Sequence, residues 1–459
     1  MNIVVLNGSP KGDTSVTIHS VKYLQKKFPD HEFNIHHIAK QIKGIARRRS
    51  TFDGIIDDIA VADGVLWTFP LYVLMIPARL KQFIELIYER DAEAAFAGKY
   101  TSALSTSVHF NDHIAHRYIQ GISGDLDMRF VASFSADMMD LLDEDERQRL
   151  IQFGDYFLSA VQNKYPTLKR YKPLVWREFQ YLPVTSPCDI DVGSNKVLVI
   201  SDAKPEHKNV QQMVDRFCAS FSSEIEVINL WDLKIVSSCI GCLQCGFDND
   251  CAFSERDEFV PFYLEKVLEA DVLIYAGTMT DRFLSTLWKT YFDRSFFMGH
   301  IPSLMGTQLG FIISGPLSQN ENLRDFFESY TGWQTANIIG FVTDEADSSE
   351  EIDTQLQSLA RRGIDFAESG YLQPSTFLGV GGHKVLRDEV WGRLRTVFQA
   401  DHRFYKDMGL YDFPMWDVPT HMMAAMGTVG MNIPKVREQF QEMLKHGVSF
   451  RHKKIVEKA

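Results

Sequence analysis

The sequence predicts an α/β protein made of two doubly wound parallel sheets in tandem, followed by a helical C-terminal extension. Two observations carry this prediction. An apolar run at residues 3–6 leads into a small-residue loop and then a helix with an apolar face, which is how an α/β domain begins. A second start of the same kind appears at residues 197–200. Beyond about residue 370 no strand pattern remains, which predicts the helical extension.

The two halves form an internal repeat. Three later segments recur at a constant offset of 208 residues: 62–66 with 270–274, 98–106 with 306–314, and 130–132 with 338–340. The first strands are only 194 residues apart, so the second copy carries 14 extra residues between its second and third strands. Each copy alternates five strands with helices, and a ligand site is expected outside the carboxyl ends of the strands.

Domain boundaries follow from this repeat. We expect domains at 1–165 and 196–370, an extended proline-containing linker at 166–195 and the extension at 371–459. Helices are predicted at 384–407 and 434–446. Three methionines between them are expected to pack in a core: Met422, Met423 and Met426.

Four cysteines occupy the region of the extra residues: Cys239, Cys242, Cys245 and Cys251. The C-x2-C-x2-C-x5-C spacing lets three thiolates on one loop converge on an iron-sulfur cube, which the fourth closes. Structural zinc usually takes two separated pairs, so this spacing fits zinc less well, although zinc and an unmetallated thiol loop remain alternatives. Cys188 and Cys218 are expected to bind nothing.

The bulk composition limits the classes of partner that the protein is expected to bind. A length of 459 residues gives ample core, and a net charge of -12 argues against a nucleic-acid surface. The local basic run Lys43, Arg47, Arg48 and Arg49 is read as a solvated face, with contact to an anion as the alternative. Apolar runs are too short to span a membrane and no signal peptide is visible at Met1, so a cytoplasmic protein is expected.

Two segments resemble a known family. Residues 8–17 and 70–84 look like the flavodoxin-like NAD(P)H-dependent FMN reductase superfamily, and the four-cysteine motif makes the chain similar to the iron-sulfur flavoproteins of anaerobes. The resemblance covers both halves to about residue 370, and residues 401–411 resemble a tail found in some members. It implies five-stranded sheets of order 2-1-3-4-5, FMN, a 4Fe-4S cluster and electron exchange with NAD(P)H. Val16 stands where the family often has Asn, and the loop after strand four lacks the usual glycines.

The first copy is the expected flavin site. Ser9, Lys11, Ser15 and Thr17 supply hydroxyls and a cation to a phosphate at a helix N-terminus. On the resemblance, the FMN-binding residues are Ser9, Lys11, Thr14, Ser15, Val16, Thr17, Pro70, Leu71, Tyr72, Val73, Leu74, Thr106, Ser107, His109 and Asn111. A generic strand-to-helix turn is the alternative, and Tyr72, His109 and Asn111 are as readily explained as polar groups at strand ends.

The second copy is expected to hold the cluster instead. Asp202 replaces Gly8 and Glu206 replaces Gly12, and carboxylates repel a dianionic phosphate. The pair would then imitate the homodimer of simpler relatives, with residues 279–283 or the loop 239–251 bordering the flavin pocket. Further homo-oligomerisation is left open.

The expected function is an oxidoreductase or electron-transfer flavoprotein containing FMN and a 4Fe-4S cluster, with a reduced nicotinamide or ferredoxin-type donor. Its partners are then small-molecule or protein electron donors and acceptors, and no catalytic side chain is assigned. One alternative is an NAD(P)H-dependent FMN, quinone or nitro reductase with a zinc or thiol loop. The other is a non-catalytic redox carrier or scaffold that docks a partner through the tail.

Overall fold

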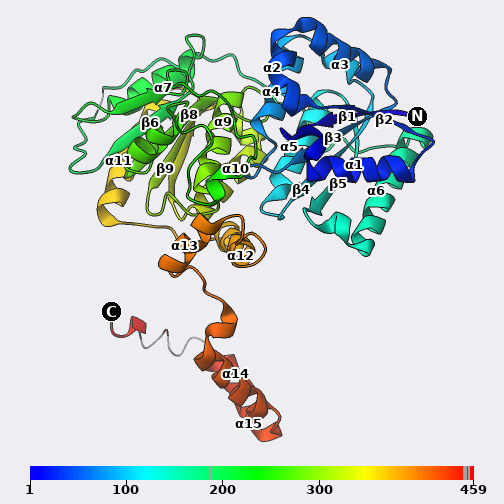
Figure 1. Ribbon diagram of the computed structural model, residues 1–459. Helices are drawn as coiled ribbons and strands as arrows, with labels where there is room; N and C mark the ends of the chain where they lie inside the picture. The colour runs from blue at the N-terminus through cyan, green and yellow to red at the C-terminus, as the bar shows by residue number, and fades with distance from the viewer. Residues whose placement is uncertain (187, 448–451, 453–454) are drawn as a thin grey trace. The chain divides into compact units, whose positions relative to one another are not determined.

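The computed structural model describes residues 1–186, 188–447, 452 and 455–459. The chain divides into two compact units, Met1–Phe404 and Tyr405–Ala459. The first unit contains two five-stranded sheets, one from each copy of the repeat (Figure 1).

The first sheet has the strand order β2-β1-β3-β4-β5, with all its pairings parallel. Its strands are β1 (Asn2–Asn7), β2 (Glu32–His36), β3 (Gly64–Pro70), β4 (Tyr100–Ser107) and β5 (Arg129–Asp137). Helices α1 (Val16–Lys27) and α6 (Glu144–Asn163) pack on one face. The other face is covered by α2 (Ile38–Arg47), α3 (Arg49–Val61), α4 (Ala78–Glu89) and α5 (Asp112–Asp125). Alternate residues of β1 enter the two cores, which is why that strand reads as a continuous apolar run.

The second sheet repeats this order as β10-β9-β8-β6-β7. Its strands are β6 (Val197–Ser201), β7 (Glu226–Asn229), β8 (Val272–Thr278), β9 (Gln308–Ser314) and β10 (Asn337–Thr343). Helices α7 (Lys208–Cys218) and α11 (Ser349–Ser369) cover one face. Helices α9 (Thr286–Ser295) and α10 (Glu321–Trp333) cover the other. The predicted fold class is therefore confirmed.

The strand pairings locate the extra residues of the second copy. Ile3 pairs with Gly64 and Val197 pairs with Val272, so the offset changes from 194 to 208 between equivalent strands. Strand β2 begins at Glu32 and β7 at Glu226, which still differ by 194. The extra residues thus lie between β7 and β8, where the chain forms the cysteine loop, α8 (Phe259–Phe262) and a π-helical turn at Tyr263–Val267. Short 3-10 turns lie at Gly12–Thr14, Glu93–Ala95, Asp140–Leu142, Gln244–Gly246, Phe296–Met298, Leu317–Gln319 and Pro414–Trp416.

The two copies pack against each other through equivalent surfaces. Helices α4 and α9 are in contact, and the side chains of both inner faces form one continuous apolar core. The Ala78 backbone N–H donates to Asp293 over 2.7 Å, and the equivalent Thr286 N–H donates to Glu85 over 2.8 Å. The two contacts are equivalent by the internal repeat. The donors, Ala78 and Thr286, differ by 208 residues, and so do the acceptors, Glu85 and Asp293.

Close to the pseudo-two-fold axis that relates the two copies, residues contact their own counterparts in the other copy. Arg117 forms an ion pair of 2.7 Å with Asp325, its own counterpart at an offset of 208. Likewise Asn322 donates through Nδ2 to the carbonyl of Ile114 over 3.0 Å. Self-complementary contacts of this kind define an isologous, two-fold interface. The predicted pseudo-dimer is therefore present inside one chain.

The segment between α6 and β6 runs along the second copy. The Val175 N–H donates to Gln319 over 2.9 Å, and Tyr181 is buried with its hydroxyl on Asp353. This linker is thus anchored along part of its length.

The extension differs from its predicted form. Instead of one helix over 384–407, there are α12 (Phe377–Trp391) and α13 (Gln399–Asp407), because the chain turns from Gly392 to Phe398. The second unit contains α14 (Val418–Met431) and α15 (Pro434–Gly447), which pack as a hairpin. The expected core packing of three methionines is wrong, because Met422, Met423 and Met426 are all exposed. Among the described residues, no helix has the length and apolar character needed to cross a membrane.

Candidate functional site

The loop after β1 has the features of an anion site. Ser15 is the N-cap of α1 but makes no side-chain capping hydrogen bond, so its hydroxyl stands at a helix N-terminus without that role. Gly12 has φ +59, and a Cβ there would lie 2.5 Å from Cδ of Lys40. Only glycine suits that turn. The loop is tied to itself, since Asn7 accepts from the Ser9 N–H over 3.0 Å.

The loop after β3 is a strained, tight turn. Tyr72 and Met75 exchange backbone hydrogen bonds of 2.8 and 3.2 Å, and the two residues between them, Val73 and Leu74, have φ of +40 and +61. Left-handed backbone at non-glycine residues costs about 1–3 kcal/mol each and persists only where the surroundings enforce it. Lys289 of the second copy helps to hold this backbone in place, because its Nζ donates to the Tyr72 carbonyl over 2.8 Å.

These two loops line a cavity of about 320 Å³ at the junction of the copies. From the first copy it is lined by Ser9, Lys11, Thr14, Ser15, Val16, Pro70, Leu71, Tyr72, Val73, Leu74, Thr106, Ser107, Val108, Phe110 and Met138. From the second copy come Cys239, Gly241, Leu243, Phe296, Gly299, His300 and Trp333. The extension adds Leu386, Leu394, Val397 and Phe398. A cavity of this size suits a small cofactor or substrate.

The structure thus brings together most of the residues predicted for FMN. Three of the residues predicted to bind FMN do not line the cavity: Thr17, His109 and Asn111. Thr17 is buried with its hydroxyl 2.6 Å from that of Thr106. His109 bonds to Asp112 over 2.9 Å, and Asn111 is the N-cap of α5. The side chains of Thr17 and His109 thus have structural partners, and for His109 this agrees with the alternative of a polar group at a strand end.

The four cysteines surround a second, smaller cavity. Cys239, Cys242, Cys245 and Cys251 all line a space of about 20 Å³, together with apolar residues and Arg294. In the part of the chain that the structure describes, no three His, Cys, Asp or Glu side chains are grouped to hold one metal ion. A tetrahedral zinc site draws its sulfurs to about 2.3 Å from a single ion. In a 4Fe-4S cube each sulfur binds a different iron.

The cysteine loop also lines the larger cavity, through Cys239, Gly241 and Leu243. Gly241 has φ +65, and a Cβ there would overlap the Tyr72 hydroxyl. Burial and the neighbouring Cys239 thiol raise the pKa of Tyr72 far above its usual range. Burial likewise raises the pKa of Cys239 to about 12 and that of Cys245 in the same direction. These thiols stay protonated unless a cation compensates their charge.

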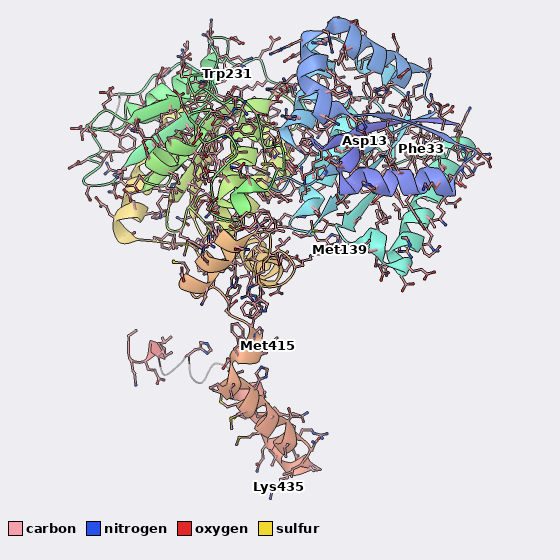
Figure 2. All side chains as sticks on the ribbon, in the orientation of Figure 1. Asp13, Phe33, Met139, Trp231, Met415 and Lys435 are labelled. Atoms are coloured by element: carbon pink, nitrogen blue, oxygen red, sulfur yellow. The ribbon has the colours of Figure 1, made fainter. Side chains whose placement is uncertain are left out.

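In the second copy, the loop after β6 is equivalent to the loop after β1, and it forms hydrogen bonds with other protein groups. Asp202 is 1% exposed and bonds to the Ser285 hydroxyl, and its carbonyl accepts from Trp231 Nε1 over 3.0 Å. Burial raises the pKa of Asp202 to about 6. Figure 2 labels Asp13, on the loop after β1, and Trp231, which follows β7 in the second copy. A carboxylate at this position disfavours a second phosphate.

Sequence reasoning missed the extension and the segment after α9. Leu386, Leu394 and Phe398 line the cavity although no local pattern singled them out. The one signal was the tail-like segment 401–411, whose Asp401 is fully buried against His300. Of the two segments expected to border the pocket, the cysteine loop lines it and residues 279–283 do not.

One family model matches part of the first copy. Residues 1–136, from β1 into β5, match the model of the NADPH-dependent FMN reductase family. No curated protein matches the chain. Among solved structures, an apo NADH:FMN oxidoreductase is 20% identical, with 37% of this chain and 96% of that one covered and a TM-score of 0.30. The NAD(P)H:(acceptor) oxidoreductase FerB from Paracoccus denitrificans is 20% identical, covering 35% and 97% with a TM-score of 0.29. General stress protein 14 from Treponema denticola, in complex with FMN, is 13% identical, covering 36% and 99% with a TM-score of 0.27.

Proposed function

We propose that the chain is a flavin-dependent oxidoreductase that binds one FMN in the cavity between its two copies and one 4Fe-4S cluster on the adjacent cysteine loop. The observation that carries this proposal is the cavity itself, which the phosphate-type loop, the strained turn and the cysteine loop all line. The family match of residues 1–136 supports a reduced nicotinamide as electron donor. FMN would supply exchange between two-electron and one-electron chemistry when bound.

The residues of the chain would bind and orient the cofactor. Ser9 and Ser15, with the N-terminus of α1, would hold the phosphate, and Lys11 would compensate its charge. The turn at Val73 and Leu74 would support the ring, because its backbone is fixed before any ligand arrives.

Four thiolates from Cys239, Cys242, Cys245 and Cys251 would hold the cluster. Apolar residues would line the side of the cluster that faces the protein, whereas Cys242 is exposed and would leave its sulfur open to solvent. Arg294, which pairs with Asp257, also lines this space. The contact between Gly241 and Tyr72 would set the approach of this loop to the flavin.

The FMN assignment is tested by charge reversal in each copy. Lys11→Glu should lower FMN occupancy at least tenfold, because it places a carboxylate beside the phosphate. The matched control is Lys204→Glu on the exposed equivalent loop of the second copy, which should retain full occupancy. Absorbance of the purified proteins measures both. Equal loss in the two variants would refute the placement of the phosphate.

The cluster is tested by iron, sulfide and zinc analysis of protein prepared without oxygen. Cys242→Ser should abolish the iron and the broad visible absorption but leave FMN bound. The matched control, Cys218→Ser, changes a cysteine of α7 outside the loop and should keep both. Stoichiometric zinc without iron or sulfide would favour the reductase without a cluster, the second candidate function.

A further inference from the structure

One buried cation beside the cysteine loop has hydrogen-bond donors that the fold does not use. Arg294 lies in the last turn of α9, and its side chain is 1% exposed. It lines the smaller cavity together with the four cysteines. Among the described residues that line this space, Arg294 alone carries a positive charge. It is not among the residues that line the larger cavity assigned to FMN.

The guanidinium of Arg294 is held rigidly by the protein. Nη1 donates to the Ser237 carbonyl over 2.9 Å and to Asp257 Oδ2 over 2.5 Å, and Nη2 donates to Asp257 Oδ1 over 3.0 Å. The guanidinium carbon also lies 5.0 Å from the ring centroids of both Phe253 and Phe259. Hydrogen bonds along one edge and two aromatic rings against the group therefore fix its position and orientation.

Two N–H groups of this side chain remain unused. A guanidinium has five N–H donors, and the bonds to Ser237 and Asp257 use three of them. Nε is buried and has no hydrogen-bond partner among the described residues. Because Asp257 takes the edge between Nη1 and Nη2, the unused donors share the edge between Nε and Nη2. That edge is the planar fork with which arginine binds an anion through two parallel hydrogen bonds.

The surroundings of this fork suit an anionic sulfur ligand. Although burial opposes the charge of the guanidinium, the Asp257 carboxylate and the thiols of Cys251 and Cys239 raise the pKa of Arg294. Buried donors without a partner destabilise a fold unless a ligand or another group completes them. Thiolates and inorganic sulfides accept hydrogen bonds, and the four cysteines of the proposed cluster line the same space as Arg294.

We propose that Arg294 donates from Nε and Nη2 to sulfur of the cluster and thereby stabilises its reduced state. This inference rests on the proposed function, which places a 4Fe-4S cluster on the cysteine loop. Four thiolates give such a cluster a net negative charge, and one-electron reduction makes it more negative. N–H donors to sulfur stabilise the more negative state more strongly, so they raise the reduction potential. Asp257 holds the guanidinium and neutralises it, so Arg294 offers donors without adding net charge.

The reduction potential of the cluster tests this role. Arg294→Lys keeps the positive charge but removes the planar fork. In protein prepared without oxygen, we expect this variant to lower the equilibrium constant for cluster reduction roughly tenfold, which corresponds to about 59 mV for one electron. A redox titration followed by electron paramagnetic resonance measures the reduced cluster separately from the flavin. FMN occupancy, measured by absorbance, should stay at the wild-type level, because Arg294 does not line the larger cavity.

Arg216→Lys is the matched control. The Arg216 side chain is 3% exposed and its Nε lies 3.5 Å from Asp353, but it belongs to α7 on the other face of the second sheet. Its replacement should change the equilibrium constant for cluster reduction by less than about twofold. If Arg294→Lys does not fold, Arg294→Met combined with Asp257→Asn removes the donors without changing the net charge, and it should lower the potential in the same direction.

Three outcomes would refute this inference: an unchanged potential in the folded Arg294 variant, an equal fall in Arg216→Lys, or a fall accompanied by loss of FMN. A fall confined to the Arg294 variant, with FMN retained, would support it. Absence of iron and sulfide from the wild type would instead refute the proposed cluster, on which the inference rests.

Discussion

Replacing Lys289 by Met tests how the second copy supports the flavin loop of the first. Lys289 is fully buried, where it pairs with Asp293 and donates to the Tyr72 carbonyl over 2.8 Å. Burial lowers the pKa of Lys289 and raises that of Asp293, so each depends on the other for its charge. Without Lys289, Asp293 keeps the Ala78 N–H as donor but loses its counter-charge. Breaking a buried pair in this way costs about 3–5 kcal/mol.

The internal repeat offers a matched control in Lys81→Met. Lys81 is the equivalent residue at an offset of 208, and it is just as buried. It bonds to Glu85 over 2.8 Å, to Asp281 over 2.9 Å and to Thr280 over 3.0 Å. Lys81→Met should therefore cost at least as much stability as Lys289→Met. No bond from Lys81 to the Tyr72 turn is present among the described contacts, so FMN affinity should be spared.

Urea unfolding followed by tryptophan fluorescence measures the stability of both variants, and fluorescence titration with FMN measures affinity. An unpaired Tyr72 carbonyl should weaken FMN binding roughly tenfold in Lys289→Met, which corresponds to about 1.4 kcal/mol. Equal weakening of FMN binding in the two variants would refute a specific support of the turn by Lys289. If Lys289→Met lowers the free energy of unfolding by less than about 1 kcal/mol, the conclusion that Lys289 and Asp293 form a stabilising buried ion pair is refuted.

Two further predictions concern single positions. Gly241→Ala should destabilise the protein by about 1–3 kcal/mol more than Gly98→Ala, because both glycines have positive φ but only Gly241 faces the Tyr72 hydroxyl. Thermal unfolding measures the difference, and equal losses would contradict the contact. Asp202 has a folded-state pKa of about 6, raised from 3.8, so the folded state binds its proton more tightly. Its contribution to stability should fall by about 3 kcal/mol as pH rises from below 3.8 to above 6. Asp202→Asn should remove that fall, and identical pH profiles for the two proteins would contradict the shift.

Local order in the chain made part of the site predictable. Ser9, Lys11 and Ser15 adjoin a strand and open a helix, and that order along the chain predicts an anion loop. The structure places all three residues in the lining of one cavity. The spacing of Cys239, Cys242, Cys245 and Cys251 likewise lies within one loop, and the structure places all four around one space. Short-range sequence patterns do not predict contacts between residues that lie far apart in the chain. The hydroxyl of Thr17 is engaged by Thr106 rather than turned to the cavity, and nothing near Thr17 in the sequence indicates this.

By itself the sequence determined that the protein is a tandem repeat of one α/β fold, because strand period, helix period and a constant offset of 208 are properties of chain order. It also determined which copy keeps glycine in the loop after its first strand and which replaces it with Asp202. Only the tertiary structure decided that the cavity between the two copies is completed by His300 and by Leu394 of the extension. The reason is physical. His300 follows α9, which packs on α4, and it pairs with the buried Asp401, 101 positions away. Leu394 follows α12, which packs on α10. No periodicity in the chain encodes contacts over such separations.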